Sequence, residues 1–467
     1  MLPFIQKHLH QRRRILLEST LCLALFLSLS PSPGGAVDKG KTSYTAEVVC
    51  AFRSIGALDP DPKTRNPDFM AKHFVNPALR SRIPGLGLDF EDAKTAMDLL
   101  GNGAFYYVNA RTRHIDSLLI AALKAGFRQV VIMGAGFDSR AYRFHETYPE
   151  VRFFEIDLPA TSADKQHRVE ALMGQKPDWV TFVPIDFNTQ TLDEVLAKAD
   201  FAADQQTLYV WEGVTYYISQ TGVDHTLRYI AEKSAPGSRI VFDYILEDVV
   251  QGMDYSAYGA RKAANFVSLV GEPYTFGISP NQLESYINLH GLRLLSDLGP
   301  KDLTQRYLVS SNGSVSGKIA GFFRVVHADV PEADEQQRLK RLAELQIKRF
   351  KTQHDLSVHK IIVPNDVQTF LNAYSDCFIR KDFDALLAYY AEDFLSDNYT
   401  RDQVISFFRM TYLDRPIHQY RIFLTRFDKR GHRAKIDGFI ARKGFRTPLM
   451  VTQIVQEEDG QWRWYGH

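Results

Sequence analysis

The chain has 467 residues, 45% of them hydrophobic, and a formal net charge of +1. This length exceeds one ordinary domain and the composition is that of a globular protein, so we expect two or three folded units. A net charge so close to zero gives no electrostatic argument for a nucleic-acid partner. The three cysteines, Cys22, Cys50 and Cys377, lie far apart, and their spacing predicts neither a metal centre nor a disulfide framework.

The first 40 residues have an unusual composition. A basic start, "KHLHQRRR", precedes an apolar core from Leu21 to Leu29 and then Pro, Gly and Ala, which is the layout of a secretory signal peptide with Ala36 as a cleavage point. The apolar run is too short to span a bilayer easily. Two interpretations stay open: an export signal or weak membrane anchor, and an extension without structure. Both leave residues 1–40 outside the fold, and membrane association requires that the segment is retained.

Residues 41–330 alternate short apolar runs with helical patterns. Five runs are rich in Val, Ile and aromatic residues and read as buried strands: "QVVIM", "VRFFEID", "TFVPID", "TLYVWEG" and "SRIVFDYI". Strands buried on both faces and separated by helices predict a parallel sheet with helices on each side. Two late runs, "LRLLSDLG" and "IAGFFRVVH", lie close in sequence and predict an antiparallel edge pair. The helical stretch 66–80, "NPDFMAKHFVNPALR", is expected to cap the site.

Residues 331–362 are highly charged, with apolar side chains at helical spacing, and predict a solvated helix that serves as a linker. From residue 363 to 467 the pattern changes. Helices are expected in "DVQTFLNAYSDCFIRKD" and "DFDALLAYYAEDF", and a third from Thr400, and alternating strands follow to the end. The segment Glu458-Asp459-Gly460 predicts a hairpin. Helices grouped before strands indicate a separate α+β unit.

A glycine-rich turn follows the first strand, in "QVVIMGAGFDSRAYRF". Gly134 and Gly136 allow the backbone to approach a ligand closely. A dinucleotide fingerprint requires a third glycine where Ser139 stands, and the Asp138 carboxylate would repel a pyrophosphate. A phosphate-free cationic cofactor tolerates both residues. S-adenosyl-L-methionine, a sulfonium cation with an amino-acid head, a ribose and an adenine, fits this description.

Acidic residues end the next three strands. Asp157 closes "FFEID", about 20 residues after the glycines, where a nucleoside-binding doubly wound fold places an acid for the ribose hydroxyls. Asp186 ends the third strand and can accept from the adenine amino group, and the main-chain N–H of Phe187 can contact the ring. Glu212 ends the fourth strand. Ligands of open α/β sheets bind at these carboxyl ends, so the residues together predict a cofactor site.

The motifs "YYVNARTRHIDSLLIAALKAGFRQVVIMGAGFDSRAYRF", "FFEIDLP", "VPIDFN" and "WEGVTYYIS" resemble those of S-adenosylmethionine-dependent methyltransferases related to leucine carboxyl methyltransferase, especially the bacterial branch, over residues 43–327. The resemblance implies a class I methyltransferase fold, a Rossmann-like doubly wound and mostly parallel sheet. It places Gly134 in the cofactor turn, Asp157 on the ribose and Glu212 near the methionine end. Arg111 matches the arginine that pairs with the cofactor carboxylate, and Arg113 stays an alternative. Lys72 matches, more loosely, a lysine that closes over the cofactor.

The expected activity is in-line O-methyl transfer to a small molecule. A carboxylate acceptor is already ionised and needs no general base, whereas a hydroxyl acceptor needs one. The candidates for that base are His73, Tyr216, Tyr217, His225 and His290. No metal is expected, and the acceptor stays open.

The C-terminal unit, residues 363–467, resembles the cone-shaped NTF2-like or SnoaL-like domains, including a late "DGQWRW" strand. The resemblance implies a ligand-binding or dimerisation module, and a homodimer through this unit is one expectation. Two alternatives to a simple methyltransferase stay open: a bifunctional enzyme whose second domain isomerises or cyclises the substrate, and a non-catalytic cofactor-binding scaffold. The cofactor is made in the cytosol, which favours the cytoplasm, although the first 40 residues favour export.

Overall fold

The structure is a computed structural model that describes residues 42–76, 86–354, 363–396, 399–413, 417, 419–442, 445–449 and 451–466. The signal-like segment 1–40, the end of the expected cap at 77–80 and the linker residues 355–362 lie outside the described residues. Within the described part of the chain, no helix combines the length and apolar character that crossing a bilayer demands.

A seven-stranded sheet forms the centre of the first unit, with the strand order β3-β2-β1-β4-β5-β7-β6. The five strands expected from the sequence, β1 to β5, run parallel. β7 runs antiparallel between β5 and β6, so the two late strands do form an antiparallel edge pair. The strands are β1 (Gln129–Met133), β2 (Arg152–Asp157), β3 (Val180–Pro184), β4 (Thr207–Trp211), β5 (Arg239–Ile245), β6 (Arg293–Leu298) and β7 (Phe323–Asp329).

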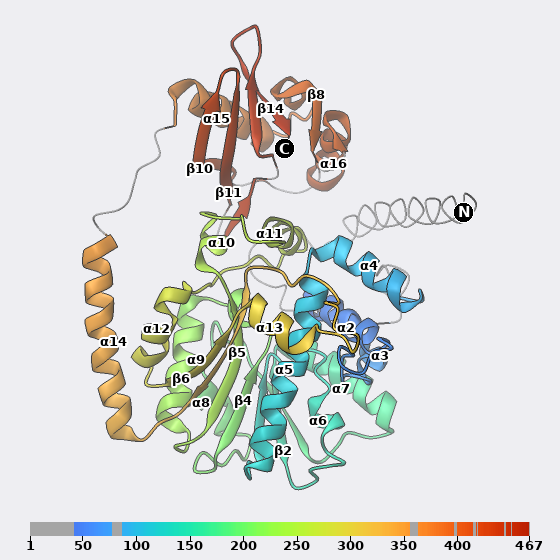
Figure 1. The fold of residues 1–467 in the computed structure, drawn as a ribbon, viewed down its shortest axis with the longest axis vertical. Coiled ribbons are helices and arrows are strands. Elements are labelled where there is room, and N and C mark those ends of the chain that lie inside the picture. Colours follow the sequence, from blue (N-terminus) through green and yellow to red (C-terminus); the bar gives the residue numbers. More distant parts are fainter. Residues whose placement is uncertain are drawn as a thin grey trace.

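Helices cover both faces of this sheet (Figure 1). Side chains alternate along a strand, so Val130 and Ile132 of β1 pack into one apolar core while Val131 and Met133 pack into the other. The first core includes α2, α5 and α7, and the second includes α8, α9 and α12. The helices of this unit are α2 (Tyr44–Gly56), α3 (Ala71–Phe74), α4 (Phe90–Gly101), α5 (Ala104–Lys124), α6 (Arg140–Arg143), α7 (Pro159–Met173), α8 (Leu192–Leu196), α9 (Gln220–Lys233), α10 (Glu247–Gln251), α11 (Ala260–Leu269), α12 (Leu283–Leu289) and α13 (Pro300–Tyr307), with 3₁₀ turns η2 (Thr215–Tyr217) and η3 (Pro280–Gln282).

The charged segment after the first unit is helical, as expected. Helix α14 (Ala333–His354) runs along α12 (Figure 1), and the Ser285 hydroxyl donates to Gln346 Oε1 at 2.6 Å. Leu339 and Ala343 are buried, whereas the outer face is charged. The helix therefore belongs to the surface of the first unit over most of its length.

A second sheet, with the order β10-β11-β13-β14-β8-β9 and β12 paired to β11, forms the C-terminal unit. An aromatic core packs between this sheet and its helices. The expected third helix begins after Thr400, which closes a capping box with Gln403, and β13 and β14 form the expected hairpin. The elements are α15 (Asn365–Ile379), η4 (Ala385–Tyr389), β8 (Tyr390–Ser396), β9 (Tyr399–Thr400), α16 (Arg401–Tyr412), β10 (Arg421–Arg430), β11 (Arg433–Arg442), β12 (Phe445–Pro448), β13 (Gln453–Gln456) and β14 (Trp462–Gly466).

The helix expected in "DFDALLAYYAEDF", residues 382–394, is wrong. The first half forms the 3₁₀ turn η4, and the second half forms strand β8, which pairs in parallel with β14 through Tyr390 and Trp464. Tyr390 and Phe394 are buried in the aromatic core. The pairing of β8 with β14 and β9 therefore overrides the local helical pattern.

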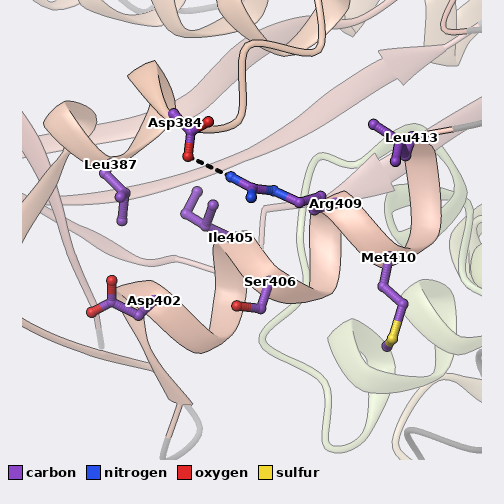
Figure 2. A pocket seen from close by; sticks show the side chains of 8 residues that line it. All are labelled: Asp384, Leu387, Asp402, Ile405, Ser406, Arg409, Met410 and Leu413. Atoms are coloured by element: carbon purple, nitrogen blue, oxygen red, sulfur yellow. Dashed lines mark hydrogen bonds and ion pairs between the residues drawn. The ribbon is translucent and has the colours of Figure 1, made fainter.

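The C-terminal unit also has an open groove between η4 and α16, of about 500 Å³ (Figure 2). The Arg409 guanidinium reaches across it to the Asp384 carboxylate; the Arg409 side chain is about half exposed and that of Asp384 largely exposed. Met410 and Leu413 supply apolar surface. The groove is a shallow surface feature of the second unit.

Candidate functional site

A cavity of about 200 Å³ lies at the carboxyl ends of β1, β2, β3 and β4. The seven residues predicted from the sequence to hold a cofactor all line it. They are Arg111, Gly134, Gly136, Asp157, Asp186, Phe187 and Glu212. The structure therefore brings together, around one space, side chains that are up to 101 positions apart in sequence.

The turn after β1 forms the floor of the cavity. Gly134 has a φ of 64° and Gly136 a φ of 43°, in the left-handed region that other residues adopt only with strain. A Cβ on Gly134 would also lie 2.1 Å from Cγ2 of Val214, so no side chain fits there. Gly136 has more room, because its added Cβ would meet the Ala46 methyl at 3.6 Å. The absence of a side chain at Gly134 is thus required twice over.

Asp157 closes β2 and faces the same turn. Its Oδ2 accepts from the N–H of Gly136 at 2.5 Å, and its Oδ1 accepts from the N–H of Leu158 at 2.6 Å. Burial raises the pKa of this carboxyl above its ordinary value, and the two N–H donors oppose that rise. Each oxygen keeps acceptor capacity toward the cavity, because a carboxylate oxygen can accept two hydrogen bonds.

Asp186 and Phe187 follow β3. Asp186 Oδ1 accepts from the N–H of Asn188 at 3.0 Å, which bends the chain into a turn at the cavity edge. The ring of Phe187 is half-buried and lies 5.8 Å from the ring of Trp211. An acid and an apolar ring thus lie next to each other at this end of the cavity.

Glu212 and Arg111 form a buried ion pair at the other end. Glu212 Oε1 accepts from Arg111 Nε at 2.9 Å, and Oε2 accepts from Arg140 Nη1 at 2.6 Å. Burial disfavours the charge on Glu212, but Arg140 and Arg111 outweigh it and lower the pKa. Glu212 therefore orients two arginines, a role that the sequence did not indicate.

The structure separates the two arginine candidates. Arg111 is buried and lines the cavity, whereas Arg113 does not and donates to the Arg65 carbonyl at 2.6 Å. Burial lowers the pKa of Arg113. Of the two, only Arg111 is placed where it can meet a ligand.

The Asp138 carboxylate is compensated by a neighbouring arginine, contrary to the repulsion expected from the sequence. Asp138 lines the cavity, but it accepts from the Arg140 N–H at 2.7 Å and pairs with the Arg140 guanidinium. Burial opposes ionisation, yet the positive charge of Arg140 lowers the pKa of Asp138 to about 2. Because a guanidinium compensates this carboxylate, it repels an anion less than its position suggested.

Three further features of the site were not predicted from the sequence. Asp243 of β5 is fully buried and accepts from the Arg111 guanidinium, from Tyr107 Oη at 2.9 Å and from the Gly213 N–H at 2.6 Å. An acid inside the apolar run "SRIVFDYI" is the signal that could have indicated it. Glu272 and helix α2 also line the cavity. No local pattern marks either of them.

The expected cap lies elsewhere. Within 66–76, no residue lines the cavity, and Lys72 is exposed. Asp68 instead pairs with Arg53 of α2 at 2.9 Å and so supports the helix that does form the wall. Of the base candidates, Tyr216 and Tyr217 line the cavity, and the three histidines do not. His290 pairs with Asp224 at 3.1 Å, a His–acid contact that the sequence did not indicate.

Comparison with known proteins identifies the family of this chain. The family model of leucine carboxyl methyltransferase matches residues 46–231. A protein of Streptomyces coelicolor, whose name describes it as an S-adenosyl-L-methionine-dependent methyltransferase, is 32% identical over 211 residues, which cover 45% of this chain and 68% of that protein. A protein of Mycobacteroides abscessus with the same description is 32% identical over 202 residues, covering 43% of this chain and 63% of that protein.

The match spans less than two thirds of the length of some relatives. It covers 63% of the M. abscessus protein and 65% of a protein from Mycolicibacterium gilvum with the same description. A solved structure of a DUF574 family protein from Streptomyces avermitilis covers 62% of this chain and 98% of its own, with 13% identity and a TM-score of 0.39. That score is too low to add to the assignment. The identity to the S. coelicolor protein is sufficient, and the chain belongs to the S-adenosyl-L-methionine-dependent methyltransferases related to leucine carboxyl methyltransferase.

Proposed function

We propose that the protein binds S-adenosyl-L-methionine in the cavity at the ends of β1 to β4 and methylates an oxygen of a small-molecule acceptor. The observation that carries the proposal is the convergence of all seven predicted residues on this one cavity. Family membership supports the same chemistry. The acceptor class and the roles of single residues are parts of the proposal.

The charge of the cavity wall suits a cationic ligand. Of the described residues that line it, five carry a carboxylate and two carry a guanidinium: Asp138, Asp157, Asp186, Glu212 and Glu272 against Arg53 and Arg111. S-adenosyl-L-methionine carries a sulfonium and an ammonium against one carboxylate. Arg140 pairs with both Asp138 and Glu212, so the acids that favour this ligand over a nucleotide with several phosphates are Asp157, Asp186 and Glu272.

The polar groups also fit the parts of the ligand. Asp157 would accept from the ribose hydroxyls with the acceptor capacity that its two main-chain donors leave. Asp186 and Phe187 would hold the adenine, because an acid and an apolar ring match its amino group and its faces. Arg111 would hold the ligand carboxylate through guanidinium N–H groups, while Glu212 and Asp243 keep its side chain in place.

When bound, the cofactor supplies an activated methyl group that leaves its sulfur as the acceptor oxygen attacks from the opposite side. The contribution of the chain is to hold both partners in line and to exclude water. Tyr216 and Tyr217 line the wall, and burial raises the pKa of each phenol well above its ordinary value. Such phenols are poor bases at neutral pH, so we favour an acceptor that is already ionised, such as a carboxylate.

Calorimetric titration of the protein with S-adenosyl-L-methionine tests the binding step. We expect saturable binding of one ligand per chain, and S-adenosylhomocysteine should compete. A screen of small carboxylic acids and phenols with a labelled methyl donor then tests the transfer step. Absence of binding would leave only a scaffold function, whereas binding without transfer to any oxygen acceptor would overturn the proposed chemistry.

For the C-terminal unit we propose an accessory NTF2-like module rather than a second catalytic centre. Aromatic side chains fill the space between its sheet and helices, including Tyr374, Tyr390 and Trp464. The hydroxyls of Tyr374 and Tyr390 are hydrogen-bonded to each other at 2.8 Å. A cyclase or isomerase needs space for its substrate beside an acid or base, and aromatic rings fill this space. Product analysis by mass spectrometry, with methylation as the only change expected, distinguishes this proposal from the bifunctional alternative.

A further inference from the structure

The C-terminal unit contacts the first unit at Arg261, a residue of the first unit at the start of helix α11. The Arg261 Nη2 lies 2.5 Å from Asp437 Oδ1 of β11, and its Nη1 donates to the Leu449 carbonyl. Both charged side chains of this pair are mostly buried. Nearby, a Cβ on Gly252 would lie 2.6 Å from Cβ of Phe439, so the two units are closely packed. Figure 1 shows the second sheet seated over α10 and α11.

The far end of α11 leads directly to Glu272. The helix ends at Leu269, and the N–H of Glu272 donates to the Val267 carbonyl at 2.9 Å, which ties this residue to the last turn. Ten helical residues span about 15 Å. A contact at Arg261 and the position of Glu272 are therefore connected by one short, continuous helix.

Glu272 holds the beginning of helix α2. Its Oε1 accepts from the Tyr44 N–H at 2.9 Å, and its Oε2 accepts from the Thr45 N–H at 3.1 Å and from the Thr45 hydroxyl. The first N–H groups of a helix have no partner within it, and a carboxylate there also opposes the positive end of the helix dipole. The rings of Tyr44 and Phe266 lie 6.4 Å apart and add a second contact between α2 and α11.

Helix α2 is a wall of the cofactor cavity. Residues from its first three turns line the cavity: Thr45, Ala46, Val49 and Arg53. Arg53 is anchored in the first unit by Asp68 and the Phe137 carbonyl. The first turn of the wall is held by Glu272, by the N-cap Ser43 and by the ion pair of Glu47 with Arg168 of α7.

We propose that Glu272 is a positioning residue that keeps α2 closed over the cavity, and that the C-terminal unit supports it through the Arg261–Asp437 pair. The second unit then has a defined role: it holds α11, the helix that leads to Glu272. We call the contact of Glu272 with the start of α2 the latch. The effect on ligand affinity rests on the proposed function, whereas the effect on the mobility of α2 does not.

The first experiment compares hydrogen exchange of residues 44–53 in the wild-type protein with that in the Glu272→Gln variant, both without ligand. Glutamine keeps the size but has one oxygen acceptor and no charge, so we expect about fivefold faster exchange in this helix. Cofactor affinity, measured by calorimetry, should fall by a similar factor. Unchanged exchange at α2 would overturn the latch whether or not the protein binds the cofactor.

The second experiment tests the support from the C-terminal unit with Asp437→Asn. Asp428→Asn is the matched control, because Asp428 lies on the same β10–β11 hairpin and pairs with Arg430 at 3.5 Å within that unit. We expect exchange of residues 44–53 to rise in Asp437→Asn and to stay at the wild-type level in the control.

The double variant Glu272→Gln/Asp437→Asn completes a cycle. If α11 couples the two residues, hydrogen exchange of residues 44–53 in the double variant should be little faster than in Glu272→Gln alone. Independent, multiplying effects would show that the C-terminal unit does not act through Glu272. Wild-type exchange in Asp437→Asn would overturn the supporting role and leave the latch to be judged by the first experiment.

Discussion

The carboxylate of Asp157 lies against the backbone of Gly136, with Oδ2 and the N–H only 2.5 Å apart. One acid therefore does two things: it stabilises the glycine turn after β1 and it presents acceptors to the cavity. Sequence spacing indicated the second role but not the first. The contact joins the ends of two neighbouring strands at the point where the proposed cofactor lies.

We predict that Asp157→Ala weakens binding of S-adenosyl-L-methionine by about 1–3 kcal/mol, or roughly 5- to 150-fold, because ligand hydroxyls and two N–H groups lose their acceptor. Calorimetry measures this loss. Glu150→Ala is the control, since Glu150 pairs with Arg128 on the surface before β2 begins. Wild-type affinity in Asp157→Ala would rule out the placement of the ribose at this residue.

Gly134→Ala should disrupt the site more than Gly136→Ala. Both substitutions place a methyl group at positive φ, at about 1–2 kcal/mol each. At Gly134 the methyl group also collides with Val214, and overpacking adds about 1–3 kcal/mol. Urea unfolding and cofactor titration of both variants check the order.

Adding Val214→Ala to Gly134→Ala removes the Cγ2 atom that causes the collision. We expect the double variant to recover the overpacking part of the loss but not the part due to backbone strain. If Val214→Ala gave no recovery, the defect of Gly134→Ala would be one of backbone conformation alone.

Much of the fold could be predicted because its signals are local. Each parallel strand is a short apolar run, and the residues at the strand ends reveal the site once the sheet is parallel. The position of β7 between β5 and β6 was not predictable in this way, since strand pairing depends on distant partners. The same reason explains the error at residues 382–394, where β14 decides that Tyr390 begins a strand.

The residues of the candidate site likewise fall into those with a local sequence signal and those that only the tertiary structure places there. Asp157 ends β2 and Glu212 directly follows β4, so local patterns indicated both, whereas Glu272 reaches α2 across 227 positions of sequence. Of the predicted cap, 66–80, the described part contains the short helix α3 and supports the wall from behind through Asp68. Local patterns therefore identified which residues lie at the sheet edge, and only the tertiary structure identified what closes over them.

Asp243→Ala should cost about 3–5 kcal/mol of unfolding free energy, because it leaves the buried Arg111 guanidinium without one of its two carboxylates. Asp376→Ala breaks an ion pair of similar geometry, 2.8 Å to Arg421, whose side chains are about half exposed. That variant should cost less than about 1 kcal/mol. Urea unfolding measures both, and equal costs would contradict the view that burial makes the Arg111 cluster important.

His114 should make the stability of the protein depend on pH. Burial, together with the charge of Arg306, lowers the pKa of His114 to about 4 from the ordinary 6.5, and the neutral ring lies 2.9 Å from Tyr307 Oη. Between these two values the unfolded chain binds a proton that the folded chain does not. The contribution of the neutral His114 side chain to the unfolding free energy is therefore fully present above pH 6.5 and is lost as the pH falls toward 4.

We predict that the unfolding free energy of the wild type, relative to that of His114→Gln, falls by about 2 kcal/mol between pH 7 and pH 4.5. Chemical denaturation at each pH measures the difference. His225→Gln is the control, because His225 is exposed on α9 and its replacement leaves the buried His114 ring in place. Parallel profiles for the wild type and His114→Gln would mean that His114 binds protons equally in the folded and unfolded chains, against the burial that the structure gives it.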